Sequence, residues 1–181
     1  MSPDMARGLL AFWRDAGMAK WFRGGAAFDA ECRERWQEAH FSAARRECDA
    51  WMQAADSALA LVVLLDQIPR NIFRGSGHAF ATDPLALLHA NHAIAAGFDA
   101  QVDPALQMFF YLPFEHSEVL ADQQRAVALF TALDNPDLLG YAVAHRDVIA
   151  QFGRFPHRNA ILGRASSAEE LAYLAQPGAG F

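Results

Sequence analysis

The sequence is short of lysine and of net positive charge, and these shortages argue against one large class of partner. Among its 15 basic residues only Lys20 is a lysine, and 21 acidic residues bring the net charge to −6. Binding along a phosphate backbone needs an electropositive face, so nucleic acid is not an expected partner. Codon usage is the simpler explanation of the arginine preference, and pairing of guanidinium groups with carboxylates or phosphates is the other.

Few cysteines and no long apolar run are present either. Cys32 and Cys48 form no metal or redox motif, so we expect reduced thiols without a functional role. The apolar run Ala58–Leu65 is far shorter than the ~20 residues of a membrane helix. No basic segment followed by an apolar core stands at the N-terminus, so no signal peptide is visible. We therefore expect a soluble, cytoplasmic protein without a membrane partner.

Strand-like alternation of apolar and polar residues is almost absent, whereas apolar residues recur at helical spacings of three and four. This pattern predicts helices over roughly 2–17, 28–46, 57–68, 83–97, 104–111, 115–133 and 135–153. A last helix is expected after a capping box formed by Ser166 and Glu169. No linker, low-complexity segment or charge block interrupts the chain. The expected fold is all-α: a single compact domain over residues 1–181, built from antiparallel helix pairs.

Polar side chains interrupt the apolar faces of three of these helices. Asp66 continues the apolar stripe of the helix that Pro69 is expected to end, because proline lacks a backbone donor. His116 and Gln123 lie on the apolar stripe of the helix expected over 115–133, and His145 lies on that of the next helix. Buried polar groups need hydrogen-bond partners, so we expect these side chains to be buried and to contact one another or a ligand.

A second concentration of polar residues, Phe152–Asn159, follows the helix that carries His145. It contains Arg154, His157, Arg158 and Asn159 in a connection stiffened by proline. Such a segment either bonds the last carbonyls of neighbouring helices or binds an anionic ligand. The end of the central helix, Ile68–Asn71, repeats part of this pattern.

The motifs that mark common cofactor and metal sites are missing. No Walker loop, dinucleotide fingerprint or HExxH sequence is present, so no cofactor is expected. His89 and His92 lack further cysteine, histidine or acidic ligands nearby, so no metal site is expected. Ser117 beside an Asp–His pair has the chemistry of a nucleophile, but no nucleophile elbow supports that role. These motifs assign no enzymatic reaction.

Three segments resemble those of a bacterial family catalogued as domain of unknown function 924. They are Leu65–Asn71, His116–Glu118 with Asp122–Gln123, and Phe152–Asn159. The similarity extends over most of the chain, from Phe12–Trp13 to the last helix. It implies a tetratricopeptide-like, all-helical fold and implies no activity. Val119 stands where relatives tend to have an acid, so any role of that acid does not transfer to this chain.

Three functions fit this sequence. In the first, a polar pocket binds a small anionic ligand. Its candidate residues are Asp66, Gln67, Arg70, Asn71, His116, Ser117, Glu118, Gln123, His145, Arg154, His157, Arg158 and Asn159, and the three motifs are expected to converge there. In the second, a helical-repeat groove binds a protein or peptide without catalysis. In the third, the polar groups only fasten helices together. The sequence indicates no oligomeric state.

Overall fold

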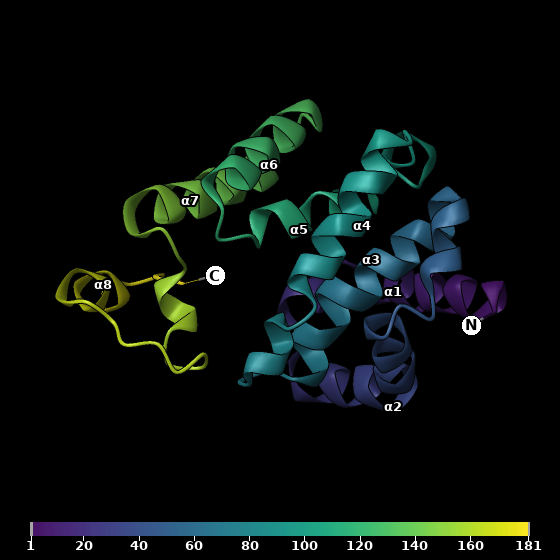
Figure 1. The fold of residues 1–181 in the computed structure, drawn as a ribbon, viewed down its shortest axis with the longest axis horizontal. Helices are drawn as coiled ribbons and strands as arrows, with labels where there is room; N and C mark the ends of the chain where they lie inside the picture. Colours follow the sequence, from purple (N-terminus) through teal and green to yellow (C-terminus); the bar gives the residue numbers. More distant parts are fainter. Residues whose placement is uncertain (1, 181) are drawn as a thin grey trace. The chain divides into compact units, whose positions relative to one another are not determined.

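The computed structural model describes residues 2–180, and helices joined by turns and loops make up this part of the chain, with no strand (Figure 1). The all-α prediction is confirmed. The α-helices are α1 (Pro3–Arg23), α2 (Gly25–Ala44), α3 (Ala55–Ile72), α4 (Asp83–Ala95), α5 (Leu112–Glu115), α6 (Leu120–Ala132), α7 (Pro136–Phe152) and α8 (Ala168–Leu174). The 3₁₀ helices are η1 (Asp49–Gln53), η2 (Gly77–Phe80), η3 (Asp99–Gln101), η4 (Gln107–Phe110) and η5 (Pro156–Arg158). None of the helices among the described residues is long and apolar enough to cross a membrane.

Two compact units make up the chain, and each is described by itself. The first comprises Met1–Arg74 and His78–Pro113, and the second comprises Gly75–Gly77 and Phe114–Phe181. The expectation of a single domain over residues 1–181 stays a prediction.

Helix α3 forms the centre of the first unit. Every residue from Ala58 to Pro69 is buried, and α1, α2, α4 and η1 all pack against α3 (Figure 1). A helix that is apolar on all sides is stable only where neighbouring elements cover each side. The burial predicted from the apolar run Ala58–Leu65 is therefore confirmed.

The path of α3 through Pro69 differs from the prediction, because the helix continues to Ile72. Pro69 cannot donate to the carbonyl of Leu65, four residues earlier. The hydroxyl of Thr82 donates to that carbonyl instead, at 2.5 Å. Because the Thr82 hydroxyl donates to the Leu65 carbonyl from outside the helix, the last turn of α3 remains helical.

The second unit also departs from the prediction, because the helix expected over 115–133 is two helices. The non-helical segment 116–119 separates α5 from α6. The buried amide of Gln123 donates to the carbonyls of Glu115 at 2.6 Å and Ser117 at 2.7 Å. A side chain thus takes the place of the next helical turn in satisfying these carbonyls.

Helix α7, which packs beside α6, begins and ends as predicted (Figure 1). Asn135 caps its N-terminus, with its side-chain oxygen accepting from the amides of residues 137 and 138. Gly153 ends it in the left-handed conformation, with φ of 68°. The capping box of α8 lies one residue later than predicted, at Ser167 and Glu170. Ser166 instead accepts a hydrogen bond from the side-chain amide of Asn159.

Candidate functional site

Three of the predicted site residues lie against the ring of Phe155 in the second unit, and a fourth lies beside one of them. The ring of Phe155 lies 5.6 Å from that of His145 and 5.5 Å from that of His157, measured between centroids. The guanidinium carbon of Arg158 lies 4.5 Å from the same centroid, within the range of a cation–π contact. The ring of His116 is 6.5 Å from that of His145. We call His116, His145, His157 and Arg158 the histidine–arginine cluster.

Three different segments supply this cluster. His116 comes from the connection between α5 and α6, His145 from the inner face of α7, and the other two residues from η5. His145 and Arg158 are buried, whereas His116 and His157 are partly exposed. The expected burial of His116 is therefore wrong, because this residue lies in the non-helical segment 116–119 rather than on the inner face of a helix.

Glu115, which the sequence analysis did not single out, is the acid nearest to His145. It is 4% exposed, and its Oε1 lies 3.3 Å from Nδ1 of His145. The carbonyl of Tyr141 lies 2.9 Å from the same nitrogen. With two acceptors facing Nδ1, that nitrogen carries the hydrogen and donates it, so Nε2 of the neutral ring is the acceptor.

Burial favours the neutral forms of His145 and His157. It lowers the pKa of His145 to about 3, and the nearby His116, His157 and Arg158 act in the same direction. It also lowers the pKa of His157 to about 4, with Arg158 as the next largest cause. Both rings are thus neutral at pH 7, and the charged groups described beside them are the guanidinium of Arg158 and the carboxylate of Glu115.

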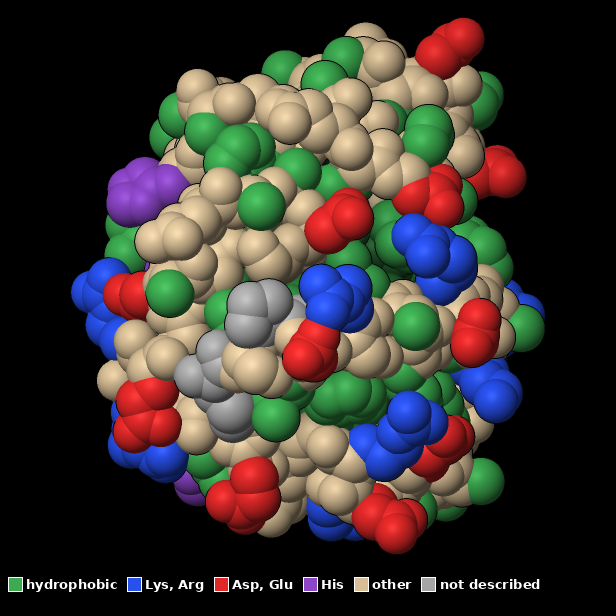
Figure 2. All heavy atoms as spheres, turned by 90° about the vertical axis from the view of Figure 1, so that its right-hand side faces the viewer, with side chains coloured by type: hydrophobic (Ala, Val, Ile, Leu, Met, Phe, Trp, Pro, Cys, Tyr) green, Lys and Arg blue, Asp and Glu red, His purple; other side chains and the backbone are tan. Residues whose placement is uncertain are grey.

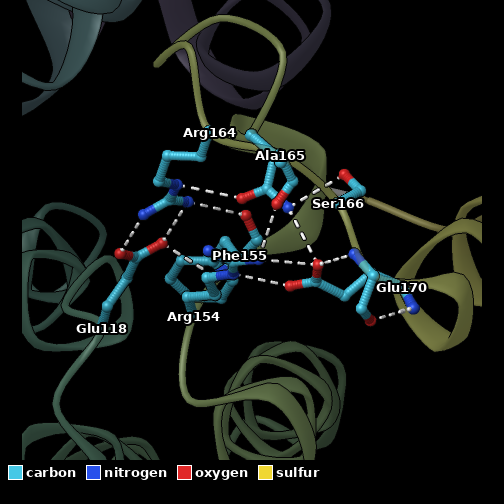
Figure 3. A network of polar contacts seen from close by, with 9 residues as sticks. Glu118, Arg154, Phe155, Arg164, Ala165, Ser166 and Glu170 are labelled. Carbon is cyan, nitrogen blue, oxygen red and sulfur yellow. Dashed lines mark hydrogen bonds and ion pairs between the residues drawn. The ribbon is translucent and has the colours of Figure 1, made fainter.

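Glu118, another predicted site residue, has a structural role. Its carboxylate accepts two hydrogen bonds from Arg164, at 2.7 and 2.9 Å, and one from the backbone amide of Phe155 at 2.7 Å (Figure 3). Although burial raises the pKa of Glu118, these bonds lower it overall. Glu118, which is itself paired with Arg164, fixes the backbone at Phe155 through this hydrogen bond. It thereby positions the Phe155 ring, against which the cluster packs.

Arg154 and Asn159 belong to the same locking network. Arg154 makes two hydrogen bonds to the carboxylate of Glu170, at 2.6 and 2.8 Å (Figure 3). The side-chain amide of Asn159 donates to Glu170 at 3.2 Å. A bidentate arginine–carboxylate pair fixes both position and orientation. The segment that carries His157 and Arg158 is therefore held at both ends by paired charges.

Ser117 and Gln123 also act within the connection between α5 and α6. The hydroxyl of Ser117 donates to the carboxylate of Asp122 at 2.7 Å and accepts from the backbone amide of Val119 at 3.2 Å. Gln123 is 0% exposed and donates to the carbonyls described above. These bonds shape the turn that presents His116.

Comparisons with known proteins show which family the chain belongs to. The family model described as a bacterial protein of unknown function (DUF924) matches residues 9–178. The chain belongs to the DUF924 family. A solved structure of a protein of unknown function from Agrobacterium tumefaciens is 50% identical, with a TM-score of 0.93. The match covers 96% of this chain and 98% of that one. No curated protein matches the chain.

The remaining predicted residues of this DUF924 protein lie together at the end of α3, in the first unit. The guanidinium of Arg70 makes two hydrogen bonds to Asp83, at 2.8 and 3.0 Å, and lies 3.3 Å from Oδ1 of Asp66. Gln67 donates to the other oxygen of Asp66 at 2.6 Å, and Asn71 donates to the carbonyl of Gln67 at 3.1 Å. The predicted convergence of this group with the histidine–arginine cluster stays a prediction.

The two histidines of α4 in the DUF924 chain have different surroundings. His89 is buried, and its Nε2 lies 3.5 Å from a carboxylate oxygen of Asp49. Burial lowers the pKa of His89, and the Asp49 charge opposes that shift. His92 is exposed. Among residues 2–180 no three histidine, cysteine or acidic side chains are grouped as a metal site would require.

Proposed function

We propose that the histidine–arginine cluster of this DUF924 protein binds a small anionic molecule. The observation that carries the proposal is the stacking of the Arg158 guanidinium on the ring of Phe155 at 4.5 Å, beside the imidazoles of His145 and His157. A guanidinium held in one plane is pre-organised for a carboxylate or phosphate group.

The neutral imidazoles of His145 and His157 add hydrogen-bonding groups beside Arg158. The net charge of −6 favours a small ligand over a nucleic acid backbone. We also propose a cytoplasmic location and no membrane partner.

Replacing Arg158 tests this function. With inorganic phosphate as the probe, isothermal titration calorimetry should detect binding to the parent protein. Arg158→Ala should weaken it by at least about tenfold, because a hydrogen bond to a charged group is lost. Arg158→Lys should bind with intermediate affinity, since lysine keeps the charge and loses the planar fork.

Arg146→Ala is the matched control, because Arg146 follows His145 on α7 but pairs with the exposed carboxylate of Asp147 at 2.6 Å. It should bind phosphate like the parent. Equal phosphate affinity in folded Arg158→Ala and in the parent protein would refute the proposal. Circular dichroism of each variant establishes that it is folded.

A second candidate function is peptide binding in a groove between α1 and α2 of the first unit. The groove encloses about 400 Å³, and Phe12 and Phe28 line it with stacked rings 5.6 Å apart. Arg35 lies 4.5 Å above the Phe12 ring and Lys20 lies 5.7 Å above that of Phe28. On the face that carries the N-terminal end of α1, apolar side chains are recessed between basic and acidic ones (Figure 2). Aromatic rings beneath cations suit an aromatic anchor next to an acidic residue.

A charge reversal at the rim tests the groove. Fluorescence anisotropy would use dodecapeptides with one tryptophan beside a glutamate, and matched peptides with lysine in place of the glutamate. The acidic peptides should bind more tightly, and the double variant Lys20→Glu, Arg35→Glu should remove this preference. Arg23→Glu, at the exposed end of α1, is the control. Equal binding of both peptide sets to the parent protein would exclude this function.

A further inference from the structure

His89, on the buried face of α4 in the first unit, is an ionisable group that makes no hydrogen bond. It is 3% exposed, and neither nitrogen of its ring has a hydrogen-bond partner among the described residues. A carboxylate oxygen, Oδ1 of Asp49 on η1, lies 3.5 Å from Nε2. Buried polar groups are nearly always hydrogen-bonded, so an imidazole in this state contributes little to holding α4 in place.

Asp49 is already paired with another residue. Its Oδ2 contacts two nitrogens of the Arg46 guanidinium, at 2.8 and 2.7 Å. Arg46 itself ends α2 in the left-handed conformation, with φ of 66°, and its amide donates to the carbonyl of Ala43 at 2.9 Å. Only Oδ1 of Asp49 therefore faces His89, at a distance beyond the range of a normal hydrogen bond.

The ionisable groups around His89 do not compensate for its burial. Asp49 favours the charged form of the ring, whereas Arg46 and His92 oppose it. Helices α3 and η4 also pack against α4, but the described residues of these two elements add no charged group that acts on the ring. Burial is the largest influence and lowers the pKa of His89. The ring is therefore kept neutral while α4 is packed in the fold.

An imidazolium at this position would be buried without a hydrogen bond, which costs much more free energy than a buried neutral ring. Local opening of α4 brings the ring to water, where it takes up a proton freely. We propose, independently of anion binding in the second unit, that His89 makes the packing of α4 sensitive to pH, so that α4 opens in mild acid. Because α4 packs against α3, opening would uncover part of the apolar surface of α3.

The direction of the effect follows from the two pKa values of His89. In the opened segment its pKa is about 6.5, the ordinary value for histidine, and in the packed form it is lower. The advantage of the packed form is thus complete above pH ~6.5 and is lost as the pH falls below this value. Uptake of one proton on opening raises the opening constant by up to about tenfold per pH unit.

Hydrogen–deuterium exchange of α4, measured by mass spectrometry at about pH 7.5 and about pH 5.5 and corrected for intrinsic rates, tests the proposal. In the parent protein the opening constant of α4 should be at least about threefold larger at the lower pH. His89→Leu cannot take up a proton and loses no hydrogen bond, because the ring makes none. In this variant the two opening constants should agree within about 1.5-fold.

His92→Gln is the matched control, since His92 lies three residues later on α4 but is exposed. This variant should keep the rise in opening that the parent protein shows in acid. An opening constant in the parent protein that does not change with pH would overturn the proposal. An equal rise in His89→Leu would also overturn it, because the proton would then bind elsewhere.

Nuclear magnetic resonance of the parent protein covers the case in which His89→Leu does not fold. The carbon-bound ring protons of His89 should titrate with a midpoint below about pH 6.5. A midpoint at or above this value would refute the proposal, because a proton would then stabilise the packed form of α4.

Discussion

Replacing Arg70 with alanine is expected to lower the free energy of unfolding by about 3–5 kcal/mol, the cost of removing one member of a buried charge cluster. The Arg70 guanidinium contacts the carboxylates of Asp66 and Asp83, at 3.3 and 2.8 Å. The Asp66 side chain is 0% exposed and that of Arg70 is 18% exposed. Without the guanidinium, two close carboxylates lose a cation that both of them face. Urea denaturation followed by circular dichroism measures the change.

Arg74→Ala is the matched control, because this arginine makes an equally regular pair while its own side chain is exposed, although that of Asp29 is only 14% exposed. Arg74 binds both oxygens of Asp29, at 2.7 and 2.9 Å, and its side chain is 60% exposed. Its loss should cost less than about 1 kcal/mol. Adding Asp66→Asn to Arg70→Ala should recover part of the stability, because one of the two like charges is gone. If Arg70→Ala costs no more than Arg74→Ala, the cluster does not stabilise the end of α3.

Replacing Gln123 with methionine should destabilise the protein by about 2–3 kcal/mol, even though the volume of the side chain is nearly kept. The amide of Gln123 donates at 2.6 and 2.7 Å to two carbonyls at the break between α5 and α6. Methionine cannot donate, so these carbonyls would be buried without that partner. Gln123→Ala should cost more than methionine does, because it also leaves a cavity.

Gln124, the next residue, supplies the control for this series. It is exposed on α6, so Gln124→Ala should change the unfolding free energy by no more than about 0.5 kcal/mol. Stabilities would be compared by thermal and urea denaturation of all three variants. A fully stable Gln123→Met would mean that the carbonyls of Glu115 and Ser117 find other donors.

Features that depend on neighbouring residues in the sequence were predictable. Prolines near the starts of α4 and α7, at Pro84 and Pro136, mark helix starts because the first turn needs no donor there. Helical spacing likewise placed Gln123 and His145 on inner faces, and both are buried. The all-α fold was predictable mainly from helix caps and apolar helix faces, because both depend on residues that are close in the sequence.

Features that depend on a distant hydrogen bond were missed. Nothing near Pro69 indicates that Thr82 would satisfy the carbonyl of Leu65. The break at 116–119 likewise depends on the direction in which the Gln123 amide turns. In the candidate site, the sequence indicated the histidines and Arg158 but not Phe155 as their common centre, because spacing along helices does not fix contacts between them.

Glu115 was missed although a signal for it exists. It follows directly on the apolar run Met108–Phe114, as Asp66 follows Ala58–Leu65, and both acids are buried. An acid that ends an apolar run is thus a candidate for burial beside a polar partner in this chain. The pattern was applied to Asp66 and not to Glu115.

The hydrogen bond from Thr82 to Leu65 has a consequence for the order of folding. The last turn of α3 cannot be completed by local pairing alone, because Pro69 leaves the Leu65 carbonyl without its helical donor. That donor arrives only when residue 82 closes the loop back onto the helix, so the turn and the start of α4 gain their stability in one step. In the transition state for folding, these two segments should therefore be formed to the same extent, whereas the upstream turns of α3 can form earlier.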